Sequence, residues 1–177
     1  MKNRVLYLIL SVAVSALLSV PEARSQHVAT PASFEGYWVG AVENEKNYSI
    51  VILRVRDGLC SRYEKKDSKL VPVQADRNTT MLDGNNLYYS QIRNDGDKGE
   101  VLVYMMSYMK ADCLHCVRIH QQTEAVEDPE TAGINYERNT RMTGRLYRYG
   151  NEKEVIDWIV DYYESLWEEG MLEDYYY

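Results

Sequence analysis

Apolar and polar residues alternate in short runs along most of the chain from residue 34 onward, a pattern typical of β-strands. Turn signals such as Asp57-Gly58 separate the runs, so neighbouring strands are expected to pair as antiparallel hairpins. The run at residues 70–74 contains Pro72, which indicates an edge strand or a bulge, and residues 81–87 indicate a turn between short strands. The eight predicted strands lie at residues 37–43, 48–56, 60–65, 70–74, 87–92, 100–109, 113–121 and 142–149.

The spacing of apolar residues changes from two to about 3.6 after residue 150, which predicts an amphipathic helix over residues 151–169. Asn151 and Glu154 have the spacing of a capping box at its start. The polar, acidic stretch 122–141, with Pro129 and Gly133, is expected to be a long loop and a candidate lid. Strands followed by one helix predict an all-β fold, an eight-stranded antiparallel up-and-down β-barrel with one C-terminal amphipathic α-helix packed outside. A β-sandwich is the alternative.

The N-terminal residues 1–25 have the organisation of a secretory signal peptide. Lys2 and Arg4 precede an apolar run, and Ala23-Arg24-Ser25 provides small residues for cleavage. A membrane anchor is the alternative, but the apolar run is short for a bilayer span. We therefore expect a secreted, extracellular protein. The predicted organisation is a signal peptide at 1–25, a lead at 26–33, the barrel at 34–150, the helix at 151–169 and an acidic, Tyr-rich tail at 170–177.

The chain is acidic and rich in tyrosine, with a formal net charge of −7 at pH 7 and 16 Tyr against one Phe. A net negative charge argues against nucleic acid and against anionic membrane surfaces as partners, and permits cationic ligands or basic proteins. Tyrosine combines a large apolar ring with a hydroxyl, which suits the walls of a half-polar binding site. No catalytic, metal-binding or cofactor-binding motif is present in the sequence, which favours a binding protein over an enzyme.

The three cysteines, Cys60, Cys113 and Cys116, predict one disulfide and one thiol in an oxidising compartment. Positions 113 and 116 of a strand point to opposite faces, so we expect Cys60 to pair with either Cys113 or Cys116. Asn47 and Asn78 begin glycosylation sequons, which are used in secreted proteins.

Three places in the chain resemble the lipocalin (calycin) family. Gly36-Tyr37-Trp38 is similar to the family's first motif, and Met106-Ser107-Tyr108 lies where the family often has Thr-Asp-Tyr. Arg145 or Arg148 lies where the family has an arginine that covers the tryptophan. The Tyr-rich, acidic composition and the positions of Cys60 and Cys113 resemble the divergent salivary histamine-binding-type lipocalins of ticks.

This resemblance implies a protein without a cofactor that sequesters a small hydrophobic or cationic ligand, either a histamine-type amine or a lipid mediator, and so counters host defence. Tyr104, Met106 and Tyr108 lie on one face of their strand. We expect this face, together with Tyr89, to line the cavity. Glu43 is placed to pair with an ammonium group near the mouth. The predicted ligand-binding residues are Trp38, Glu43, Tyr89, Tyr104, Met106 and Tyr108. The alternative function is binding of a basic host protein through the tail or the barrel rim.

Overall fold

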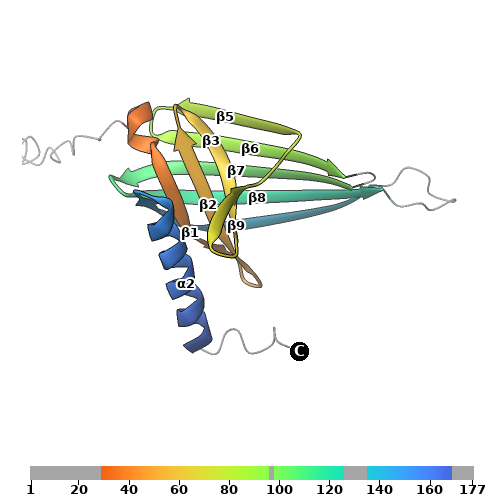
Figure 1. Cartoon of the computed structure of the whole chain (residues 1–177). Helices are drawn as coiled ribbons and strands as arrows, with labels where there is room; N and C mark the ends of the chain where they lie inside the picture. The colour runs from red at the N-terminus through yellow and green to blue at the C-terminus, as the bar shows by residue number, and fades with distance from the viewer. Residues whose placement is uncertain (1–28, 96–97, 126–134, 169–177) are drawn as a thin grey trace, which may run out of the picture.

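The computed structural model describes residues 29–95, 98–125 and 135–168. They form one antiparallel sheet, a short 3-10 helix and one long α-helix (Figure 1). The elements are η1 (Pro31–Phe34), β1 (Gly36–Glu43), β2 (Tyr48–Arg56), β3 (Leu59–Lys66), β4 (Lys69–Pro72), β5 (Arg77–Asp83), β6 (Asn86–Asp95), β7 (Lys98–Lys110), β8 (Cys113–Ala125), β9 (Asn135–Tyr149) and α2 (Glu152–Glu168). The strand order is β4-β3-β2-β1-β9-β8-β7-β6-β5, because β9 returns to pair with β1.

The sheet curls into a half-barrel of nine strands, so the predicted closed barrel of eight strands is wrong in both respects. The two edge strands, β4 and β5, are not hydrogen-bonded neighbours. Side chains bridge the gap instead: Thr80 Oγ1 accepts from the Cys60 amide at 2.9 Å, and Gln91 Nε2 donates to the Val73 carbonyl at 3.2 Å. Pro72, which has no amide hydrogen, is the last residue of β4. The ninth strand is β5, where the sequence indicated only short strands around a turn.

The predicted loop at residues 122–141 is also wrong at both of its ends. β8 continues to Ala125 and β9 begins at Asn135, with a regular register from Gln121 opposite Asn139 to Ala125 opposite Asn135. These strand ends are polar, and a ladder of backbone hydrogen bonds does not need apolar side chains. Alternation of hydrophobicity therefore could not reveal them. Residues 126–134, the remainder of the candidate lid, lie outside the described residues.

One end of the half-barrel is plugged by Trp38, which is fully buried. Its indole Nε1 donates to the Phe34 carbonyl at 2.6 Å, which ties η1 across this end. The Arg148 guanidinium lies 6.0 Å from the centre of the Trp38 ring, at the limit of a cation–π contact. Of the two arginines that the sequence left open, Arg148 is therefore the one over the tryptophan.

The α2 helix packs on the outer, convex face of the sheet, as predicted (Figure 1). Val155 and Ile159 are buried against Val39, Ile52 and Leu70, in a cluster separate from the concave core. Asn151 caps the helix as predicted, but the full capping box is not formed, because Glu154 reaches back to the Asn151 side chain and the Gly150 amide. The Glu154 amide donates to Asn151 Oδ1 at 3.1 Å, and Asn151 Nδ2 donates to Glu154 Oε1 at 2.7 Å.

Candidate functional site

Strand alternation gives the concave face an ordered series of layers between its plugged end and its open end. Along β8 the residues on this face are Leu114, Cys116, Arg118, His120 and Gln122. The register places Met106 opposite Cys116, Tyr104 opposite Arg118, and Leu102 opposite His120. The face therefore changes from apolar at the plug to polar at the open end, within a single strand.

Two of the predicted ligand-binding tyrosines meet in the middle layer. The Tyr89 and Tyr104 rings stack with centroids 5.8 Å apart and planes at 26°, and both side chains are 1% exposed. The Tyr89 hydroxyl donates to Asn78 Oδ1 at 3.1 Å. Burial raises the pKa of Tyr104, and the nearby Arg62 and Arg118 oppose that rise. Met106 lies one layer deeper, so the Tyr104 face of β7 is the concave one, and the alternative parity is excluded.

The other predicted residues are distributed more widely. Trp38 and Tyr108 lie at the plugged end, where the Tyr108 ring meets Phe34 edge-on at 5.8 Å. Glu43 is exposed and, by alternation from the buried Trp38 and Val42, lies on the convex face. It does not join the Tyr89–Tyr104 layer. The roles of all six as ligand contacts stay predictions.

Arg118 is the polar group that distinguishes this layer. Its side chain is 8% exposed, and its Nε has no hydrogen-bond partner among the residues that the structure describes. One Nη lies 3.4 Å from Met142 Sδ, which is a weak acceptor. No carboxylate of the described residues forms an ion pair with it. A buried guanidinium in this state is costly, because it has lost water without gaining a full set of acceptors.

A second arginine approaches the same layer from the gap between the sheet edges. Arg62 Nη1 lies 3.4 Å from Oε1 of Gln91, which is 2% exposed. Arg62 and Arg118 are both close enough to affect the pKa values of Tyr104 and His120. Two guanidinium groups therefore approach the stacked tyrosines.

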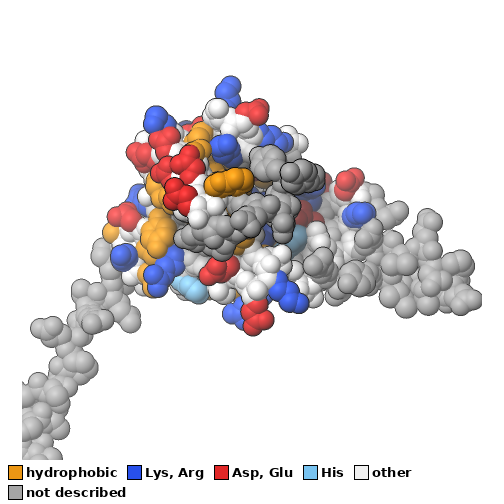
Figure 2. Space-filling view, turned by 90° about the horizontal axis from the view of Figure 1, so that it is seen from below, with side chains coloured by type: hydrophobic (Ala, Val, Ile, Leu, Met, Phe, Trp, Pro, Cys, Tyr) orange, Lys and Arg blue, Asp and Glu red, His pale blue; other side chains and the backbone are white. Residues whose placement is uncertain are grey.

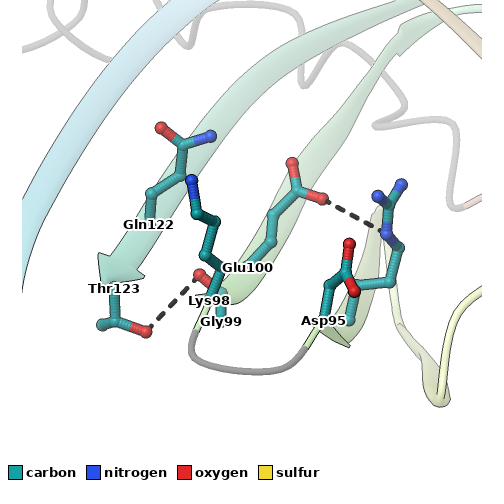
Figure 3. Close-up of a pocket in the computed structure, with 7 residues that line it drawn as sticks. Asp95, Lys98, Gly99, Glu100, Gln122 and Thr123 are labelled. Carbon is teal, nitrogen blue, oxygen red and sulfur yellow. Dashed lines mark hydrogen bonds and ion pairs between the residues drawn. The ribbon is translucent and has the colours of Figure 1, made fainter. Parts of the chain in front are cut away.

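Two carboxylates of the described residues, Asp95 and Glu100, lie at the open end, and Glu100 is already engaged. Glu100 Oε1 lies 2.8 Å from His120 Nε2, and Glu100 Oε2 lies 4.0 Å from Arg93 Nε. Burial is the main cause that lowers the pKa of His120. Beside this group is a hollow of about 350 Å³, where Lys98, Glu100 and Gln122 rise on the same side of adjacent strands (Figure 3). The hollow is lined by Arg93, Asp95, Lys98, Gly99, Glu100, Gln122 and Thr123.

The part of the concave face formed by β1, β2 and β9, beside Arg118, is apolar. Val42, Val51 and Met142 are buried in the same cluster as Tyr89 and Tyr104. The middle of the concave face thus places cationic and amide groups next to apolar side chains. This arrangement suits a molecule that is partly apolar and carries a negative charge.

Sequence reasoning missed Arg118, Arg62 and Gln91. Arg118 lies between Val117 and Ile119, and such alternation indicates a solvent-exposed arginine. The signal that could have found it was parity, because Leu114 and Cys116 share its face. This shared face could be recognised as the concave one only once the sheet was known to curl.

The three cysteines are free thiols in the structure, so the predicted disulfide is not formed there, and all three are buried. Cys60 and Cys116 belong to the concave core, whereas Cys113 does not. Of the glycosylation candidates, Asn47 and Asn78 are both exposed, and Asn78 also accepts the Tyr89 hydrogen bond. The predicted signal peptide and the tail at 170–177 lie outside the described residues.

No protein-family model matches the chain, and no curated protein or solved structure matches it either. The resemblance to lipocalins therefore stays an interpretation of the sequence. Among the described residues, no helix is long and apolar enough to cross a bilayer. The same part of the chain contains no group of three or more His, Cys, Asp or Glu side chains arranged to hold a metal ion.

Proposed function

We propose that this chain is a secreted, lipocalin-like protein that sequesters a small amphipathic anion on the concave face of its half-barrel. The proposed ligand class is a fatty-acid-derived lipid mediator with a carboxylate. Arg118 is the observation that carries the proposal, because its buried guanidinium lacks an anionic partner among the described residues. The carboxylate of such a ligand would supply the missing acceptors.

The local charge favours a carboxylate over a histamine-type amine. An ammonium group needs a carboxylate or a cluster of acceptors. Of the two acids that line the open end, Glu100 is already shared between His120 and Arg93, and Asp95 is exposed to solvent. Glu43 lies on the other face of the sheet. The net charge of −7 acts in the opposite direction, but exposed charges farther away than a Debye length, about 8 Å in physiological salt, are largely screened. A buried guanidinium is screened much less.

The layer order gives the ligand a direction. Gln122, His120 and Arg118 occupy alternate positions on the concave side of β8, and at about 3.3 Å per residue they span roughly 13 Å from the hollow to Arg118. The plugged end beyond Arg118 is filled by Trp38, Leu53 and Leu114, which are fully buried. The head group would therefore lie at Arg118, beside the apolar side chains of Val42, Val51 and Met142, and the hydrocarbon would extend towards the open end.

The test uses two ligands that differ only in the charge of the head group, dodecanoate and dodecylamine. The full chain is produced by secretion, and binding is measured by calorimetry. Dodecanoate should bind at least tenfold more tightly than dodecylamine. Arg118→Met should weaken dodecanoate binding by about 10- to 100-fold, because a hydrogen bond to a charged group contributes about 1.5–3 kcal/mol and 1.4 kcal/mol is a factor of ten.

Arg145→Met is the matched control, since Arg145 is exposed on the convex face of β9 and its replacement changes the net charge equally. Dodecanoate binding should be unchanged in this variant. Preference for the amine, or equal loss of binding in both variants, would contradict an anion site at Arg118.

A further inference from the structure

The exposed side of α2 carries an apolar stripe that the fold does not bury. Val160, Tyr163 and Trp167 are 40%, 45% and 62% exposed, and their spacing places them on one side of the helix. The buried stripe of α2 is separate and consists of Val155, Ile159 and Leu166. Burial on the sheet therefore accounts for only part of the apolar surface of this helix.

An acidic stripe runs beside the exposed apolar one. Asp157, Asp161, Glu164 and Glu168 recur at intervals of three and four residues, and residues 158–168 contain no Lys or Arg. Lys153 neutralises only Asp157, at 2.6 Å. The other three acids have no ion-pair partner among the described residues. Figure 2, which looks towards the C-terminal end of α2, shows red acidic side chains gathered next to orange hydrophobic ones.

A groove of about 840 Å³ adjoins these stripes, between α2 and the convex face of β2 and β3. Its apolar lining includes Ile50, Ile52, Ile159 and Tyr163, and Tyr48 stands at one end with its ring 6.4 Å from that of Tyr162. Lys46 and Lys65 line the sheet side of the groove. The groove is thus apolar where Ile159 and Tyr163 of α2 line it, and its sheet wall carries charges of both signs, because Arg62 and Glu64 line it as well. The acidic stripe lies on α2 beside the groove and is not part of its lining.

We propose that this groove and the exposed stripe of α2 dock a cationic amphipathic helical segment of a partner protein. The apolar side chains of the segment would lie on Ile159, Tyr163 and Trp167, and its Lys or Arg side chains would lie along Asp161, Glu164 and Glu168. A second copy of this chain is a poor occupant, because it would bring the same acidic stripe and a net charge of −7. An anionic lipid surface is disfavoured for the same reason.

This site lies on the opposite face of the sheet from Arg118, so it is independent of the proposed lipid-anion site. The probe is a fluorescein-labelled helical peptide with leucine on one face and lysine on the other, titrated with the full chain and followed by anisotropy. Two control peptides carry glutamate in place of lysine, or the same composition with the leucines spread around the helix. Only the lysine amphipathic peptide should bind, and its affinity should fall as salt is raised.

Trp167→Ala should weaken the affinity for the peptide by about tenfold, as expected for a buried aromatic anchor. Leu59→Ala is the matched control, because Leu59 is 66% exposed at the β2–β3 turn. The double variant Asp161→Asn, Glu164→Gln should reduce both the affinity and its salt dependence. The double variant Asp57→Asn, Asp83→Asn removes the same charge from distant turns and should change neither. All these positions are exposed, and circular dichroism verifies that each variant is folded.

Three results would overturn the proposal. The first is absence of binding, or equal binding of the acidic peptide. The second is an equal loss in the Trp167→Ala and Leu59→Ala variants. The third is loss of binding on removal of residues 170–177 when Trp167→Ala has no effect, which would transfer the interaction to the acidic tail.

Discussion

Replacement of Arg118 by methionine should make the unliganded protein more stable while it weakens ligand binding. Methionine keeps an unbranched side chain of similar length and has no charge to desolvate. Arg118 is 8% exposed, its Nε has no hydrogen-bond partner among the described residues, and one Nη contacts the Met142 sulfur. A residue kept at such a position, at a cost in stability, is the pattern expected of a binding group.

The magnitude follows from two opposing terms. Arg118 also forms a side-chain hydrogen bond with Tyr104, and loss of this bond costs about 1 kcal/mol. Removal of an incompletely compensated buried charge is favourable by more, since replacing buried ionic groups with apolar ones of similar volume is often neutral or stabilising by about 1–4 kcal/mol. We therefore expect a net stabilisation of about 0–3 kcal/mol. For a chain of this size, each kcal/mol raises the Tm by about 2–4 °C.

The assay is urea unfolding followed by the fluorescence of the buried Trp38, with calorimetric melting as a second measure. Arg145→Met is again the control and should change the free energy of unfolding by less than about 0.5 kcal/mol, because that side chain is exposed. The reasoning is refuted if Arg118→Met lowers stability by more than about 1 kcal/mol while the control does not. Arg118 would then be held by the fold itself, and its lack of acceptors would not indicate a ligand.

Three further predictions concern the sheet, the open end and the thiols. Gly40→Ala and Gly144→Ala should each destabilise the fold by about 1–3 kcal/mol or more in urea unfolding. A β-carbon at either position would overlap a backbone carbonyl oxygen of the neighbouring strand. Unchanged stability would show that β1 and β9 can separate there. Burial lowers the pKa of His120 below its ordinary 6.5, so the folded state binds fewer protons than the unfolded state near that pH. The stability of the fold should therefore be complete above pH 6.5 and should fall as the pH drops below it, more steeply in the wild type than in His120→Gln. Parallel pH profiles of the two proteins would contradict this. Burial raises the pKa of Cys60 and raises that of Cys116 to about 12. Iodoacetamide at neutral pH should therefore modify these two thiols only after unfolding, which mass spectrometry can follow. Rapid labelling of the native protein would indicate opening of the gap beside β3.

Features with a local cause were predicted well from the sequence. The helix cap at Asn151, the strand that contains Tyr104 and the buried Trp38 depend on residues close to one another in the chain. The ends of β8 and β9 were missed because their side chains are polar, and the backbone pairing that forms them gives no hydrophobic signal. The resemblance to lipocalins led to Arg148 as one of two candidates over Trp38, but only the register of β9 against β1 chose between them.

The sequence by itself determined an antiparallel β-fold with a C-terminal amphipathic helix, because periodicity, turns and caps are properties of neighbouring residues. Only the tertiary structure decided that the sheet stays open between β4 and β5, and that Arg62 and Arg118 come near the stacked Tyr89 and Tyr104. These residues come from β3, β8, β6 and β7, so their proximity depends on the register and curvature of the whole sheet. A buried arginine without an anion is recognisable only when every neighbour that could have paired with it has been placed.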